Sequence, residues 1–134
     1  MAKIIEVEGV GEAYAQKLIQ IGIETTSDLL EQGASPKGRK DISDKTGITE
    51  KLVLRWVNHV DLFRIKGVGE EYADLLEASG VDTVPELAQR KAENLVQKLA
   101  AANEERKRVR QLPSLAQVTA WIEEAKTLPR VITY

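Results

Sequence analysis

Several features that define whole classes of protein are missing from this sequence. It has no cysteine, so disulfide bonds and thiolate metal sites are excluded. Aromatic residues make up only 4% of the chain, so its core must be built from Leu, Ile, Val and Ala, a set that favours helices. No segment approaches the roughly eighteen apolar residues that mark a transmembrane helix, and the N-terminus lacks a signal-peptide pattern. We therefore expect a helical cytoplasmic protein that spans no membrane.

An excess of positive charge is also missing. The chain has 19 Lys and Arg residues against 21 Asp and Glu residues, which gives a net charge of −2. Binding to a polyanion by overall attraction is excluded, so any nucleic-acid binding must come from local patches. A composition of 43% hydrophobic and 30% charged residues is typical of a folded globular protein.

The sequence contains an internal repeat. A shift of 58 positions places residues 7–30 over residues 65–88, and ten of the 24 pairs are identical. Both copies begin with a Gly-Val-Gly turn that leads into a predicted helix, at Gly9 in the first copy and at Gly67 in the second. Repeats of this kind reveal how a chain is organised before any other pattern does.

The repeat divides the chain of 134 residues into two units of a similar size. Trp56 matches Trp121 at a shift of 65, so the second copy carries about seven extra residues. We predict one unit over residues 1–62 and another over residues 63–134, packed together as one compact body because each alone has a small core. The two tryptophans are the candidates for the centre of their interface.

Helical periodicity and capping residues predict four helices in each unit. The first unit is expected to have helices over residues 12–21, about 26–32, 36–46 and from 50 onward. The second is expected to have helices over 70–79, from 84, through 95–99 and from 115, where Leu115 opens an apolar stripe. The charged segment 102–110 is interpreted as an extension of the third of these helices. The tail 130–134 is expected to be extended or frayed.

The motifs resemble the helix-hairpin-helix superfamily. More specifically, the segments 38–40, 46–48, 54–58 and 63–69 look like those of a bacterial family of tandem helix-hairpin-helix proteins catalogued as a domain of unknown function. The resemblance covers nearly the whole chain. It implies an all-α, SAM-like fold that is a pseudo-symmetric duplication of one four-helix unit.

The resemblance also implies a mechanism of binding. In the superfamily, the amides of the Gly-hydrophobic-Gly hairpin lie at the start of a helix and contact a phosphate without reading sequence, often beside a Lys or Arg. Here such contacts would come from both hairpins and from the lysines near them. The basic run that contains Arg39 and Lys40 is a separate candidate phosphate patch. The candidate nucleic-acid-binding residues are Gly9, Gly11, Lys17, Arg39, Lys40, Lys66, Gly67 and Gly69.

Acidic residues leave a second interpretation open. Glu12 follows the first hairpin, and Glu70 and Glu71 follow the second. A carboxylate at a helix N-terminus satisfies the helix dipole and repels phosphate, so the glycines are also consistent with purely structural turns. The alternative function is therefore a protein-interaction or scaffold module that has kept the fold without binding nucleic acid.

No pattern in the sequence indicates catalysis. His59 is the single histidine, which offers neither a metal cluster nor a nucleophile with a base, and we interpret it as structural or exposed. The Gly-Val-Gly turn follows no predicted strand and lacks the third glycine of a dinucleotide-binding motif. We expect a non-enzymatic protein without a cofactor, metal site or small-molecule substrate, whose partner is nucleic acid or protein.

Overall fold

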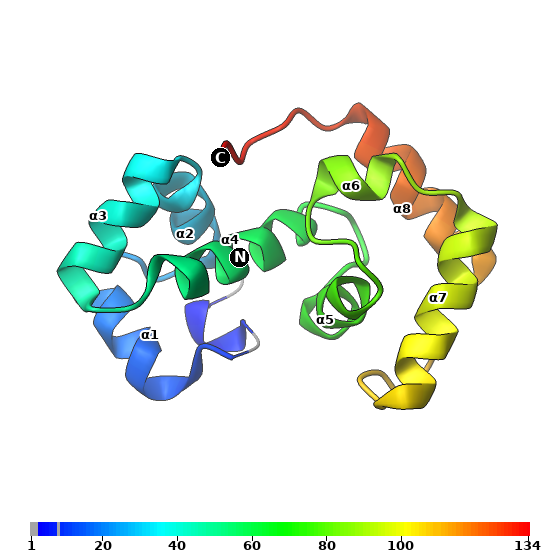
Figure 1. The fold of residues 1–134 in the computed structure, drawn as a ribbon, viewed down its shortest axis with the longest axis horizontal. Helices are drawn as coiled ribbons and strands as arrows, with labels where there is room; N and C mark the ends of the chain where they lie inside the picture. The colour runs from blue at the N-terminus through cyan, green and yellow to red at the C-terminus, as the bar shows by residue number, and fades with distance from the viewer. Residues whose placement is uncertain (1–2, 8) are drawn as a thin grey trace. The chain divides into compact units, whose positions relative to one another are not determined.

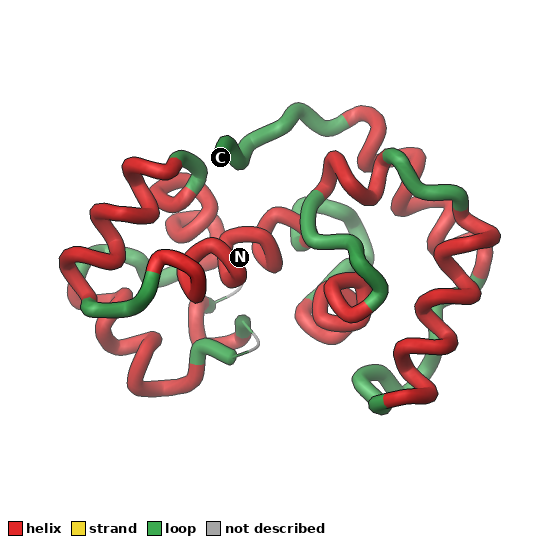
Figure 2. Tube along the Cα trace, in the orientation of Figure 1, coloured by secondary structure: helices red, strands yellow, loops and turns green. Residues whose placement is uncertain are grey.

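The computed structural model describes residues 3–7 and 9–134 of the chain. Figure 1 shows helices joined by loops, and Figure 2 shows no strand among the described residues. The predicted all-α class is therefore confirmed for this part of the chain. The chain divides into two units, one formed by Met1–Asp61 with Val131–Tyr134 and the other by Leu62–Arg130.

The first unit contains a short 3-10 helix and four α-helices (Figure 1). Their bounds are Ile4–Glu6 for η1, Gly11–Gln20 for α1, Thr26–Gly33 for α2, Pro36–Thr46 for α3 and Glu50–Leu62 for α4. The last residue of α4 is the first residue of the second unit.

Local sequence signals determine where these helices begin and end. The Thr25 hydroxyl accepts a hydrogen bond from the Asp28 backbone N–H, and the Asp28 carboxylate accepts one from the Thr25 N–H, which makes a capping box at the start of α2. Ser35 caps α3, and Pro36 is the first helical residue. Gly47, with φ of +76°, ends α3 in the left-handed conformation. Both helices begin at the residues predicted for them, 26 and 36.

The second unit contains four further helices (Figure 1). Their bounds are Glu70–Ala78 for α5, Val84–Ala88 for α6, Ala92–Glu105 for α7 and Leu115–Thr127 for α8. The last helix begins at residue 115, as predicted, because Ser114 and Gln117 form a capping box at its start. Within the described residues, no helix of either unit has both the length and the apolarity that crossing a membrane requires.

The charged segment 102–110 differs from its prediction. Only its first residues extend α7, which ends at Glu105. The Asn103 side-chain oxygen accepts hydrogen bonds from the backbone N–H groups of Arg108 at 2.8 Å and Val109 at 3.1 Å, and its Nδ2 donates to the Val109 carbonyl at 3.3 Å. These bonds compete with the helix and form a turn, which buried Val109 anchors to the core. The sequence gives no sign of this turn, because the segment consists mostly of charged residues.

Each unit has its own apolar core, as its helical stripes predict. One predicted stripe position lies outside the core, however. Leu115, at the very start of α8, is 48% exposed because the helix reaches the core only from Val118 onward, and Ile19 on α1 is likewise 45% exposed. The largest buried residues of the first unit include Leu18, Ile23, Leu29 and Trp56, and those of the second include Leu75, Leu76, Leu87, Leu95 and Leu99.

A tyrosine packs against a tryptophan in each core. Tyr14 contacts Trp56 in the first unit, with ring centroids 5.3 Å apart and planes tilted by 60°. Tyr72 contacts Trp121 in the second, at 5.2 Å and 55°. Both indoles are buried core residues, and each packs against the tyrosine of its own unit.

The C-terminal tail is extended and packs on the first unit. The Thr133 N–H donates to the Ala34 carbonyl at 2.8 Å, at the junction of α2 and α3, and Ile132 is buried. Arg39 Nη2 donates to the Thr133 carbonyl at 2.7 Å, and its guanidinium lies 5.7 Å from the centroid of the Tyr134 ring. Residues 131–134, which the predicted boundary assigns to the second unit, therefore group with the first.

Candidate functional site

The first Gly-Val-Gly hairpin is a tight turn that leads directly into α1. Gly9 and Gly11 have φ angles of +86° and +67°, values that residues with a Cβ rarely adopt. Val10 lies between them and is buried, and its N–H donates to the Val7 carbonyl at 3.1 Å. The buried valine fixes the turn, while the two glycines are exposed on either side of it.

Two side chains of α4 lie directly against Gly9. A Cβ built on this glycine would be 3.2 Å from Arg55 Nη1 and 3.7 Å from Trp56 Nε1. The indole Nε1 is buried and makes no hydrogen bond with any described residue. Gly9 is therefore required both by its backbone angle and by the close approach of α4, which places a guanidinium beside the hairpin.

The start of α1 is not capped by a side chain. Val10 occupies the N-cap position, and its side chain has no oxygen that could accept a hydrogen bond. In contrast, α2, α3 and α8 each have an N-cap hydroxyl that accepts a hydrogen bond from a backbone N–H of the first turn. Glu12 lies in the first turn, is exposed and makes no hydrogen bond or ion pair with a described residue. The backbone N–H groups in the first turn of α1 can donate hydrogen bonds to an anion, and the helix dipole favours negative charge at this end. The negative charge of the Glu12 carboxylate repels such an anion.

The second hairpin has a different geometry. Gly67 repeats the conformation of Gly9, with φ of +89°, and a Cβ on it would be 3.4 Å from Trp121 Nε1. Gly69, in contrast, has φ of −100° and is the N-cap residue of α5. The Lys66 backbone N–H donates to the Glu124 carboxylate at 3.0 Å, so one amide of this hairpin already has an anionic partner from α8.

The predicted basic residues have different environments. Lys17 lies in the last turn of α1 and Lys66 precedes the second hairpin, and both are exposed. Arg39 is buried, and its guanidinium donates to the carbonyls of Gly33, Ala34 and Thr133, which accounts for its role without a ligand. Lys40 is exposed and pairs with Asp44 at 3.6 Å, on the same helix.

Sequence reasoning missed Arg55 as a neighbour of the hairpin. It lies on α4, far from Gly9 in the sequence, and only the packing of α4 against the turn brings the two together. One feature of the sequence could have indicated this contact: Arg55 directly precedes Trp56, a core residue of the same repeated unit as the hairpin.

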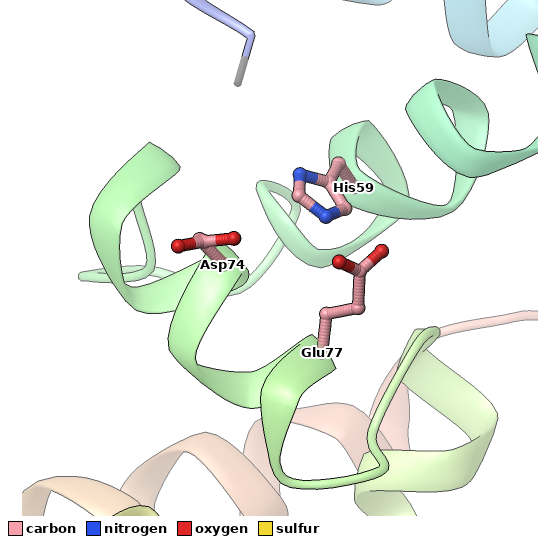
Figure 3. A group of neighbouring side chains, drawn as sticks. All are labelled: His59, Asp74 and Glu77. Atoms are coloured by element: carbon pink, nitrogen blue, oxygen red, sulfur yellow. The ribbon is translucent and has the colours of Figure 1, made fainter. Parts of the chain in front are cut away.

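The titratable residues near the end of α4 and on α5 are shown in Figure 3. His59 is buried and belongs to the first unit. Asp74 and Glu77 belong to the second unit and lie three residues apart on α5, where Asp74 forms an ion pair with Arg108 Nε at 3.3 Å. Within either unit these side chains provide fewer ligands than a metal site requires.

Comparison with known proteins identifies a family. No curated protein and no solved structure matches the sequence. The model of a family described as a domain of unknown function, DUF4332, matches residues 8–128. This match includes both hairpins and every α-helix of the two units. The chain therefore belongs to the DUF4332 family.

Proposed function

We propose that this protein is a non-enzymatic, cytoplasmic module of two tandem helix-hairpin-helix units, of bacterial type, that binds the backbone of nucleic acid through its first hairpin. One observation carries the proposal: the Gly9–Gly11 turn opens into the uncapped N-terminus of α1, with the Arg55 guanidinium beside Gly9. The equivalent Gly–Trp and Tyr–Trp contacts in the two units support the duplication.

The chemistry of this turn suits a phosphate. Backbone amides at a helix N-terminus donate hydrogen bonds along the direction of the helix dipole, and a guanidinium adds a charged, forked donor. None of these groups distinguishes one base from another, so binding would be independent of sequence. The carboxylate of Glu12 weakens the attraction, so we expect modest affinity that falls steeply with salt.

The second hairpin has a structural role in this proposal. Glu124 accepts the hydrogen bond that the Lys66 N–H would otherwise offer to a phosphate oxygen. A phosphate at this turn would lie close to the Glu124 carboxylate and be repelled by it. We therefore propose the first hairpin as the phosphate contact, although both hairpins have the same Gly-Val-Gly motif.

A titration tests the proposal. Fluorescence anisotropy with labelled single-stranded, duplex and hairpin oligonucleotides at low salt should give saturable binding by the wild-type protein. The Arg55→Gln variant should bind more weakly, and the slope of log K against log salt should decrease by about 1, as expected for one lost phosphate contact. Arg110→Gln, which removes an exposed arginine from the second unit, is the matched control and should bind as the wild type does. A flat titration with all three oligonucleotides would refute the proposal.

A specific feature supports the alternative of a protein-interaction module. A groove of about 420 Å³ lies between η1 and α1, and it is lined by the aliphatic side chains of Ile5 and Ile19, which are 46% and 45% exposed. Exposed aliphatic side chains beside a groove are a common feature of protein-binding surfaces. If this function holds, Ile19→Ser should abolish a partner interaction that survives nuclease treatment, whereas Arg55→Gln should leave it intact.

A further inference from the structure

A second groove lies along the start of α7, in the second unit. It has a volume of about 590 Å³ and is open to solvent. Three cationic and three amide side chains line it, and none of the described residues in its lining is acidic. These six residues are Arg90, Lys91, Lys98, Gln89, Asn94 and Gln97. We call this feature the α7 groove.

The cations of the α7 groove are available to a ligand. Lys91 and Lys98 are exposed and form no ion pair with a described residue. Arg90 is held in place because its Nη2 donates to the Gly80 carbonyl at 3.1 Å, which leaves further N–H donors on the same guanidinium. Three positive charges in one groove repel each other, and an anionic ligand relieves that repulsion.

The arrangement suits an anion with repeated charges. Lys91 precedes the first residue of α7 and Lys98 is seven positions later, which places them about 10 Å apart along the helix axis. A single carboxylate or free phosphate contacts one of them, whereas a polymer of phosphates reaches both. The amides of Gln89 and Asn94 supply neutral donors of the kind that contact phosphate oxygens.

The shared fold does not require this groove. In the first unit, the matching junction between the second and third helices is closed, because the Ala34 carbonyl accepts the Thr133 N–H and Arg39 donates to the Thr133 carbonyl. The third helix there begins with a Ser35 cap, whereas α7 begins after Lys91 without a side-chain cap. The open, basic character of the junction is therefore specific to the second unit.

We propose that the α7 groove is a phosphate-backbone contact, with Lys91 and Lys98 as its main cations. This inference rests on the proposed function. It assigns the nucleic-acid contact of the second unit to the α7 groove instead of to the second hairpin. The groove binds nucleic acid through its phosphates and without reading bases.

The test compares two double variants that remove equal charge. Lys91→Ala/Lys98→Ala removes both lysines of the groove, and Lys37→Ala/Lys45→Ala removes two exposed lysines from α3. With labelled single-stranded and duplex oligonucleotides, the groove variant should bind about tenfold more weakly at low salt, and its salt slope should decrease by about 2. The α3 variant should have the wild-type slope. Circular dichroism checks that both variants fold.

Each outcome separates this inference from the proposed function. If the wild type binds the oligonucleotides and both double variants bind them as tightly as the wild type does, the α7 groove is not a contact. The inference then fails while the proposed function of the first hairpin stands. If the groove variant weakens binding while Arg55→Gln does not, the inference stands and the hairpin assignment fails. If no oligonucleotide binds, both fail. If a poly-glutamate peptide binds the wild type but not the groove variant, and oligonucleotide binding is equal in both, the groove is a site for acidic protein segments and the inference is overturned.

Discussion

Trp56 Nε1 lies 3.7 Å from the point where a Cβ on Gly9 would be, and Trp121 Nε1 lies 3.4 Å from the same point on Gly67. In each unit the core tryptophan packs directly beneath the hairpin glycine, whose φ is strongly positive. The hairpins are thus tied to their cores through a side chain of the last helix of each unit.

Replacement of Gly9 should therefore destabilise the protein. Gly9→Ala forces a Cβ into a left-handed backbone conformation, 3.2 Å from Arg55 Nη1, which should cost about 1–3 kcal/mol. Gly69→Ala is the control, because Gly69 has φ of −100° and open space around it, and it should change stability by less than about 0.5 kcal/mol. Urea unfolding measures both, and equal effects would contradict this account of Gly9.

The two repeated tyrosines should respond differently to loss of the hydroxyl. Tyr72 donates a hydrogen bond to the Gln111 carbonyl at 3.1 Å, so Tyr72→Phe should cost about 0.5–1 kcal/mol. Tyr14 keeps the ring contact but makes no hydroxyl bond with a described residue, and Tyr14→Phe should be nearly neutral. Thermal unfolding of the pair tests this, and a larger loss for Tyr14→Phe would be inconsistent with the structure.

Arg39 should hold the C-terminal tail on the first unit. Arg39→Met removes the donor to three backbone carbonyls, of which the buried Gly33 carbonyl loses its Arg39 partner in a place that water does not readily reach, at a cost of about 1–3 kcal/mol. The Thr133 amide should then exchange with solvent much faster in hydrogen-exchange measurements. Lys40→Met on the same helix removes only an exposed pair with Asp44 and should cost less than about 0.5 kcal/mol. Unchanged protection of Thr133 in Arg39→Met would disprove this role.

The α2 capping box should make stability sensitive to acid. The backbone N–H groups of Glu24 and Thr25 bond the Asp28 carboxylate and lower its pKa below the ordinary value of 3.8. A carboxyl whose folded-state pKa is lowered contributes stability that is fully present above the ordinary value and is lost as the pH falls through the folded-state pKa. The wild type should therefore lose more stability below about pH 4 than Asp28→Asn does. Parallel losses in a urea series over this range would argue against the capping box as the source.

The sequence predicted the helices well wherever a local signal marked their ends. Thr25, Ser35, Gly47 and Ser114 each act within a few residues, so the chain nearby is enough to recognise them. Segment 102–110 differs from its prediction because the Asn103 side chain competes with the helix for backbone groups, and a run of charged residues gives no sign of this competition.

The candidate site was less predictable because it depends on contacts distant in sequence. Arg55 reaches Gly9 only through helix packing, and Glu124 reaches Lys66 from the last helix. The lysines of the α7 groove are separated by six residues, one of them the acidic Glu93, so they do not form a basic run in the sequence. They become part of one surface only through helical spacing.

The central claim is that the first hairpin binds phosphate although the Glu12 carboxylate repels it. The most direct test is to measure oligonucleotide affinity at low salt for Glu12→Gln and for Glu71→Gln, which removes the same charge from the first turn of α5. We predict that Glu12→Gln tightens binding a few-fold, because a carboxylate near the α1 dipole no longer repels phosphate, and that Glu71→Gln binds as the wild type does. Equal affinities for both variants and the wild type would contradict the claim.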